Sequence, residues 1–441
     1  MSLTTPEKLQ KLQQALHAKA KGSPDHRFHA LYDKVYRTDV LAFAYRCCRA
    51  NGGAPGVDGQ TFDAIESYGV ETWLSELAEE LATKRYRPLP VRRVMIPKEN
   101  GKLRPLGIPT IKDRVVQKAV VLLLEPILEA DLPPEQFAYR AGRNASHAVT
   151  AVVKLLRSGH TEVIDADLSE YFESIPHAEL MQCIARRIVD GSLLHLIKMW
   201  LVVPVEENDE QGRTTRTTRN RDIGRGVPQG SPLSPLLSNW YMRRFVWGWR
   251  TLGHEKRLNA RIVNYADDFV ICCKSTGAQA MAAMRDMMQR LKLTINEQKT
   301  RHCVLPGNSF HFLGFEFGLM YSRRNGFAYW GVRARKERVQ GVCRQVHDLT
   351  SAQTTYYGVE DRVARLNELL EGWANYFSLG TVSRVYNMID HYTVRRLRQW
   401  LRRKHLVKRG SYLRWSYDYF YKTLGLVCLA KRRGRLPWAE A

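Results

Sequence analysis

Two adjacent aspartates, Asp267 and Asp268, lie within residues 261–272, and no Gly, Pro or other charge separates them from the apolar runs on either side. This pattern predicts a β-hairpin with buried arms and a tight turn that displays both carboxylates. Adjacent carboxylates repel each other, so the turn is costly unless a cation binds there. Mg²⁺ prefers oxygen ligands and often shares them with substrate phosphates. For these residues alone, a solvated turn between two ordinary strands is an equally good explanation.

A second acidic strand end lies upstream, within residues 163–175. Nucleotidyl transfer by two metal ions needs one further carboxylate from a separate strand. Asp167 is the candidate that bridges the two ions. Asp165 lies two residues earlier and would share its strand face, so it competes for that role.

Further motifs follow in order along the chain. They are a D-L-x-x-x-F segment from Asp167, a PQGxxLSPLLxN segment from Pro228 and a YADD segment from Tyr265. Together they resemble motifs A, B and C of reverse transcriptases. The closest resemblance is to the proteins encoded by bacterial group II introns, which combine a reverse transcriptase and a maturase in one chain.

The resemblance extends well beyond these three motifs, from about Gly52 to at least Phe377. Segments similar to the family's fingers, its "FGFRPGR" stretch, motif D, the primer grip and the maturase segment are residues 98–117, 136–143, 296–300, 312–315 and 373–377. Many members also end in an endonuclease with paired cysteines. Here Cys428 is the only late cysteine, so the chain resembles the endonuclease-lacking subgroup typified by class C introns.

The resemblance implies that Asp167 and Asp267 hold two Mg²⁺ ions and that Asp268 contributes from the side, either as a direct ligand or behind the direct ligands. One ion would activate the primer 3′-hydroxyl, and the other would neutralise the triphosphate and the pyrophosphate leaving group. Lys299 matches the motif D lysine, which implies a general acid for pyrophosphate. A surface lysine at a helix end is the alternative for Lys299.

Four residues are implied to contact the incoming nucleotide. Lys98 and Arg104 would grip the triphosphate, since an arginine fork suits bidentate phosphate contacts and a lysine serves as a point charge; two exposed hairpin charges are the alternative. Gln229 would contact the base or sugar, beside a glycine that permits close backbone approach. Phe172 lies where reverse transcriptases carry an aromatic steric gate against the ribose 2′-hydroxyl, or it is a core residue. Glu173 replaces the family's usual Asp and keeps its charge.

The charge balance predicts a polyanionic partner. Lys and Arg number 68 against 44 Asp and Glu, a net charge of +24, and neutralising phosphates with release of counterions supplies affinity for nucleic acids. From His391 onward, 14 Lys and Arg accompany only two acids, with aromatic residues among them. The apolar residues of this tail predict a small folded basic domain rather than a disordered arm.

No sequence signal predicts secretion or insertion into a membrane. Residues 1–8 lack the apolar core of a signal peptide, and no segment approaches the roughly 20 apolar residues of a membrane-spanning helix. The eight cysteines form no paired framework, which argues against disulfides and zinc. We therefore expect a bacterial cytoplasmic protein without a membrane partner, associated with the nucleoid when it is on target DNA.

The expected fold class is α+β: a right-hand polymerase with fingers, an antiparallel palm sheet, a helical thumb and a small basic C-terminal domain. The expected domains are a helical N-terminal extension (1–50), fingers and palm (51–320), thumb and maturase domain (321–382) and a DNA-binding domain (383–441).

Local patterns predict several elements of this fold. The predicted helices cover residues 115–130, 177–201 and 278–291, and a hairpin joins 91–97 to 102–109 across Asn100-Gly101. Residues 206–221 form a polar hairpin or, more safely, a loop. A domain boundary is expected near residues 318–326, followed by helices over 336–377.

The leading functional hypothesis is an RNA-directed DNA polymerase that also binds its intron RNA as a maturase and supports retrohoming. Its partners would be group II intron RNA, an RNA template, a DNA primer or target and dNTPs. A maturase with a vestigial polymerase is the first alternative, and the three carboxylates disfavour it. A domesticated enzyme of host repair or defence is the second.

Overall fold

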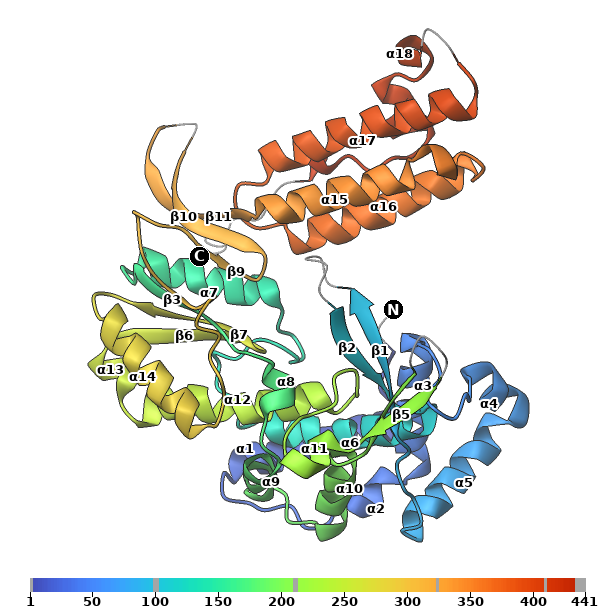
Figure 1. Ribbon diagram of the computed structural model, residues 1–441, viewed down its shortest axis with the longest axis vertical. Helices are drawn as coiled ribbons and strands as arrows, with labels where there is room; N and C mark the ends of the chain where they lie inside the picture. Colours follow the sequence, from blue (N-terminus) through green and yellow to red (C-terminus); the bar gives the residue numbers. More distant parts are fainter. Residues whose placement is uncertain (1–2, 98–102, 209–212, 323–324, 408–410, 433–441) are drawn as a thin grey trace. The chain divides into compact units, whose positions relative to one another are not determined.

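A computed structural model describes residues 3–97, 103–208, 213–322, 325–407 and 411–432 of the chain (Figure 1). The chain forms two compact units, each built from three segments. The first unit comprises Met1–Gly142, Asp167–Gly253 and Ala282–Gln298, and the second comprises Arg143–Ala166, His254–Met281 and Lys299–Ala441. Helices and antiparallel strand pairs are mixed along the chain, so the α+β prediction is confirmed. The boundaries of the four predicted domains differ from those of these two units, and the domain ranges stay a prediction.

The N-terminal helices of the first unit pack on α6 (Ile111–Glu129), which is buried along most of its length. They are α1 (Glu7–Gly22), α2 (Tyr32–Val35) and α3 (Thr38–Asn51). Thr110 caps α6 by accepting a hydrogen bond from the Asp113 backbone N–H at 3.1 Å, which satisfies one of the donors left unpaired at a helix start. The predicted helices in residues 1–50 and 115–130 are therefore confirmed.

Buried Arg187 fastens the loop after α1 to the rest of the first unit. Its guanidinium donates to the carbonyl oxygens of Ala20 and His26 at 2.6 and 2.9 Å and pairs with Asp131 at 2.9 Å. A buried arginine needs such partners, because an unpaired charge in the core is very costly. The other helices of this unit are α4 (Phe62–Tyr68), α5 (Val70–Ala82), α8 (Tyr171–Ser174), α9 (His177–Ala185), α10 (Gly191–Leu201), α11 (Arg219–Ile223) and α12 (Ser234–Thr251).

A four-stranded sheet in the order β2-β1-β4-β5 completes the first unit. Strands β1 (Val91–Pro97) and β2 (Leu103–Ile108) pair antiparallel, with Pro97 opposite Leu103, so the predicted hairpin is confirmed. Its turn lies outside the described residues. Strands β4 (Val205–Asn208) and β5 (Thr214–Thr217) form a second antiparallel hairpin. For residues 206–221 the hairpin interpretation was therefore better than the pure loop.

The second unit contains a four-stranded sheet in the order β6-β7-β3-β8. Its strands are β6 (Ala260–Tyr265), β7 (Asp268–Cys273), β3 (Glu162–Asp167) and β8 (Arg301–Val304). Helix α7 (Ala145–Arg157) packs against β6 and β7 through a strongly apolar face. Two more helices, α13 (His254–Arg257) and α14 (Gly277–Arg290), flank this region in the chain, and α14 confirms the helix predicted over 278–291.

A smaller antiparallel sheet, in the order β11-β10-β9, also lies in the second unit. It consists of β9 (Phe310–Phe312), β10 (Phe315–Tyr321) and β11 (Ala328–Ala334). Gly318 of β10 pairs with Gly331 of β11. The boundary expected near residues 318–326 thus falls between two paired strands, and residues 323 and 324 lie outside the described residues.

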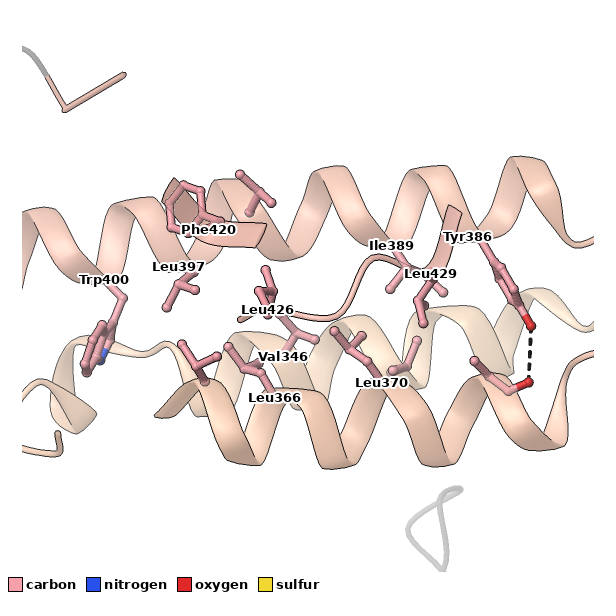
Figure 2. Close-up of a cluster of buried hydrophobic side chains, with 14 of the residues drawn as sticks. Val346, Leu366, Leu370, Tyr386, Ile389, Leu397, Trp400, Phe420, Leu426 and Leu429 are labelled. Atoms are coloured by element: carbon pink, nitrogen blue, oxygen red, sulfur yellow. Dashed lines mark hydrogen bonds between the residues drawn. The ribbon is translucent and has the colours of Figure 1, made fainter. Parts of the chain in front are cut away.

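Three long helices of the second unit share one hydrophobic core (Figure 2). They are α15 (Lys336–Leu349), α16 (Val359–Tyr376) and α17 (Ser383–Lys404). Side chains from all three meet residues of the following segment, which holds the short elements α18 (Ser411–Arg414), η2 (Tyr419–Thr423) and η3 (Leu429–Lys431). Phe420 and Leu429 of this segment are fully buried between the helices. Among the described residues, the basic tail therefore has no core separate from that of α15 and α16.

Asp390 of α17 holds the end of this segment in place. Its buried carboxylate accepts hydrogen bonds from the backbone N–H groups of Leu429 and Ala430 at 3.0 and 2.8 Å. These bonds satisfy donors at the start of η3. Within the described parts of the chain, no helix is both long enough and apolar enough to span a membrane.

Leu370→Ala tests the shared helical core. Leu370 is fully buried, so the truncation should lower the free energy of unfolding by about 2–5 kcal/mol. Urea unfolding followed by tryptophan fluorescence measures the change. The matched control is Leu406→Ala, because Leu406 is 86% exposed and should change stability by less than about 0.5 kcal/mol. Equal midpoints for the two variants would contradict the packing.

Candidate active site

The two adjacent aspartates lie at a two-residue hairpin turn, as predicted. Tyr265 of β6 pairs with Asp268 of β7, which leaves Ala266 and Asp267 as the turn. Ala266 has a φ of +59°, a left-handed conformation that costs an L-residue roughly 1–2 kcal/mol. Asn264 supports it: this fully buried side chain donates from Nδ2 to the Ala266 carbonyl at 2.8 Å. The turn exposes Asp267 and leaves Asp268 half-buried.

The end of α16 lies beside this hairpin within the second unit. The Tyr376 hydroxyl donates to the Leu313 carbonyl at 3.1 Å, and its ring stacks on Phe315. Burial raises the pKa of Tyr376, and the charges of Tyr265 and Asp268 raise it further. The segments similar to the primer grip and the maturase segment thus meet next to Asp268.

Asp167 is the last residue of β3, the strand next to β7 in the sheet order. It is half-buried, and its backbone carbonyl accepts from the Asn296 N–H at 2.8 Å. Asp165, the competitor on the same strand face, pairs in register with Arg301 of β8. Asp167 lies at the strand end that the sequence predicts, whereas Asp165 lies inside β3, and which of them serves as a ligand stays a prediction.

The donor chemistry of these strand ends fits a hard divalent cation, because Asp167, Asp267 and Asp268 supply only carboxylate oxygens. Within the described ranges, however, no group of three His, Cys, Asp or Glu side chains is placed to hold a metal ion. The metal set therefore stays a prediction. Lys299 lies in an exposed turn before β8 rather than at a helix end, and its role as a general acid also stays a prediction.

The first unit brings together residues that the sequence assigned to the nucleotide. Nε of Arg104 on β2 donates to Oε1 of Gln229 at 2.8 Å, and Nε2 of Gln229 donates to the Glu173 carboxylate. Burial raises the pKa of Glu173, and the charge of Glu170 adds to the effect. Arg104 is exposed, whereas Gln229 and Glu173 are half-buried. Lys98, the fourth predicted contact, lies outside the described residues.

A backbone contact fixes the loop that carries Gln229 against β2. The Gly107 N–H donates to the Gln229 carbonyl at 2.6 Å. Gly230 has a φ of +104°, and a Cβ there would lie 2.3 Å from the Gly107 carbonyl oxygen. A Cβ at Gly107 would lie 2.6 Å from Val91. Only glycines fit at both positions, so the predicted close approach at Gly230 is to the protein's own backbone.

Phe172, the predicted steric gate, lies in α8 and is 8% exposed. Its ring meets Tyr171 edge-on at 5.7 Å, and its carbonyl accepts from the Val227 N–H at 2.8 Å. The Tyr171 hydroxyl in turn donates to the Ser238 carbonyl at 2.7 Å. Phe172 is thus firmly held next to Glu173, and its role as a gate stays a prediction.

Sequence reasoning missed several side chains that hold these motifs together. Gln136 donates to the Asn239 carbonyl at 3.0 Å, and the Asn239 amide donates to the Ala138 carbonyl at 2.6 Å. These buried amides join the motif of residues 136–143 to the helix after Gln229. The sequence indicates only the charge of Glu173 and assigns no role to Asn264. Buried amides in apolar surroundings were the available signal.

Two parts of the chain match models of known protein families. Residues 96–317 match the family model described as "Reverse transcriptase (RNA-dependent DNA polymerase)", and residues 339–420 match "Group II intron, maturase-specific domain". The chain is 34% identical to Protein YkfC of Escherichia coli K12, over 69% of this chain and 87% of YkfC. It is 26% identical to the group II intron-encoded protein LtrA of Lactococcus lactis subsp. cremoris, over 72% of this chain and 61% of LtrA.

Among solved structures, a chain of a partial Cas6-RT-Cas1–Cas2 complex is similar to 59% of this chain, at 22% identity and a TM-score of 0.36. The similarity covers 41% of that chain. A TM-score this low supports no argument about shared function.

Gly230→Ala tests the backbone contact between β2 and the Gln229 loop. The added methyl would overlap the Gly107 carbonyl, so the loop or β2 must move. We expect the free energy of unfolding to fall by about 1–3 kcal/mol. Gly69→Ala is the matched control, since Gly69 has a similar φ of +108° but a Cβ there would meet Thr72 Oγ1 at 3.7 Å, an ordinary van der Waals contact. Thermal unfolding should show a lower midpoint for Gly230→Ala than for Gly69→Ala. The same midpoint in both would argue against the contact.

Proposed function

Because the chain belongs to the reverse transcriptase family and carries a group II intron maturase domain, we propose two activities for it. It copies RNA into DNA, and it binds group II intron RNA as a splicing maturase. The observation that carries the proposal is the Asp267–Asp268 hairpin turn within the matched residues 96–317. Support for intron RNA comes from the maturase match over residues 339–420. Retrohoming of the intron is part of the same proposal.

The proposed reaction joins a primer 3′-hydroxyl to an incoming dNTP. Two bound Mg²⁺ ions would supply Lewis-acid activation and charge neutralisation. The chain's own contribution would be the carboxylates of Asp167, Asp267 and Asp268 as ligands, and Arg104 and Gln229 as contacts to the nucleotide. Positioning and charge neutralisation account for most of the catalysis in phosphoryl transfer.

The proposed partners are an RNA template, a DNA primer or target, dNTPs and intron RNA. The net charge of +24 supports polyanionic partners, since phosphate contacts dominate affinity for nucleic acids. On α17, five exposed basic side chains form a surface without an exposed acid, and they are Arg384, His391, Arg395, Arg402 and Arg403. We propose that this surface contacts nucleic acid and that the protein acts in the bacterial cytoplasm, without a membrane partner.

Replacement of Asp267 and Asp268 by Ala tests the polymerase. Primer extension on an RNA template with Mg²⁺ should fall at least ~100-fold, because the proposed metal site loses two of its three carboxylates. A chelator should abolish wild-type synthesis, and added Mg²⁺ should restore it. Asp286→Ala removes one exposed charge paired with Arg290 and should have no effect.

Binding of the intron RNA to the Asp267/Asp268 double variant separates the two proposed activities. Retained binding with lost synthesis supports both of them. Absence of cDNA from the wild type, together with tight RNA binding, would leave only the maturase.

Phe172→Val tests the proposed steric gate. A smaller side chain should admit the ribose 2′-hydroxyl and raise the use of rNTPs relative to dNTPs about 10- to 100-fold. Steady-state kcat/KM for matched rNTP and dNTP pairs measures this ratio. If Phe172 serves only the core, the thermal midpoint will fall while the ratio stays at the wild-type value.

A further inference from the structure

Glu173 ends a chain of side-chain hydrogen bonds that begins at Arg104. We propose that Glu173 is a positioning residue of the nucleotide pocket, whose carboxylate sets the direction of the Gln229 amide and through it holds Arg104. This inference rests on the proposed function, because it assigns a task within a polymerase pocket. From the sequence alone, position 173 only keeps the negative charge of the residue that it replaces.

The chemistry of the three groups allows one orientation of the amide. An ionised carboxylate only accepts hydrogen bonds, and a guanidinium only donates them. Gln229 must therefore turn Nε2 toward Glu173, and its Oε1 then accepts from Arg104 Nε at 2.8 Å. A flipped amide would place oxygen against carboxylate and N–H against guanidinium. Glu173 thus determines which Gln229 atom Arg104 meets.

The backbone leaves the amide little freedom to move away. The Gln229 carbonyl accepts from the Gly107 N–H at 2.6 Å, and Gly107 lies three residues after Arg104 on β2. Gln229 is therefore joined to β2 twice, once through its backbone and once through its side chain. Because a guanidinium has five N–H donors and the Gln229 bond uses one, a held Arg104 retains donors for phosphate oxygens.

The surroundings of Glu173 make this control sensitive to protonation. Burial raises the pKa of Glu173 and the charge of Glu170 raises it further, whereas the Gln229 hydrogen bond and the Arg104 charge lower it. A protonated Glu173 can donate to Oε1 of Gln229, which is the atom that Arg104 uses. Protonation should therefore loosen Arg104, and grip on the triphosphate should weaken as pH falls through the pKa of Glu173.

Glu173→Gln is the first test, because it keeps the size of the side chain and removes its acceptor-only character. A glutamine can accept from or donate to Gln229, so either amide direction becomes possible. In single-nucleotide incorporation on an RNA template, KM for dNTP should rise about 3- to 10-fold, while kcat stays within about twofold. Glu170→Gln is the matched control: it removes a nearby exposed charge outside the hydrogen-bonded chain, and its KM should stay at the wild-type value.

Combination with Arg104→Gln tests whether Glu173 acts through Arg104. Groups in one hydrogen-bonded network show non-additive effects, whereas independent groups add. Glu173→Gln should therefore raise KM much less in the Arg104→Gln background than in the wild type. If the effects of the two substitutions on KM are fully additive, the inference is wrong, even when the enzyme is active.

The pH profile supplies an independent readout. Wild-type KM for dNTP should rise as pH falls through the pKa of Glu173, and Glu173→Gln should lack this rise. An identical profile in both proteins, or an unchanged KM, would overturn the inference. If the wild type makes no cDNA at all, the proposed function itself fails, and that result is distinct from each of these outcomes.

Discussion

The hydrogen bond from Gly107 to the Gln229 carbonyl is the contact on which the arrangement of the first unit's site depends. It brings two backbones so close that a Cβ at Gly230 would overlap the Gly107 carbonyl oxygen, while a Cβ at Gly107 would overlap the Val91 side chain. Arg104 and Gln229 can meet only because this contact sets the distance between β2 and the loop. A methyl group at either glycine would therefore disturb the approach of β2 to the Gln229 loop without replacing Arg104 or Gln229.

At the hairpin of the second unit, a supporting hydrogen bond compensates for backbone strain. A left-handed alanine is an unfavourable choice for a two-residue turn, where Gly or Asn would fit without strain. Asn264 offsets part of that cost from inside the core. Strain of this kind persists where the surrounding structure holds it in place. The result is an exposed Asp267 next to a half-buried Asp268, so that two chemically identical acids have different surroundings.

The sequence predicted the elements whose signal is local. The arms beside Asp267 are apolar runs, and Asn100-Gly101 is typical of a two-residue hairpin turn, so both hairpins followed from short stretches. Contacts between distant segments leave no such trace. Glu173 and Gln229 are 56 positions apart in the sequence, and no local pattern around either residue predicts their contact. The sharing of one core by α15, α16, α17 and the basic segment was missed for the same reason, since composition gives the charge of a segment but not the partner that it packs against.

The shared helical core constrains how the chain can vary. Phe420 and Leu429 fill space between α15, α16 and α17, the first of which begins at Lys336. An exchange of this C-terminal segment with a relative would replace part of the interior of α15, α16 and α17. Recombination near residue 382 would therefore join mismatched halves of one core. The maturase helices and the basic segment are thus expected to be inherited together.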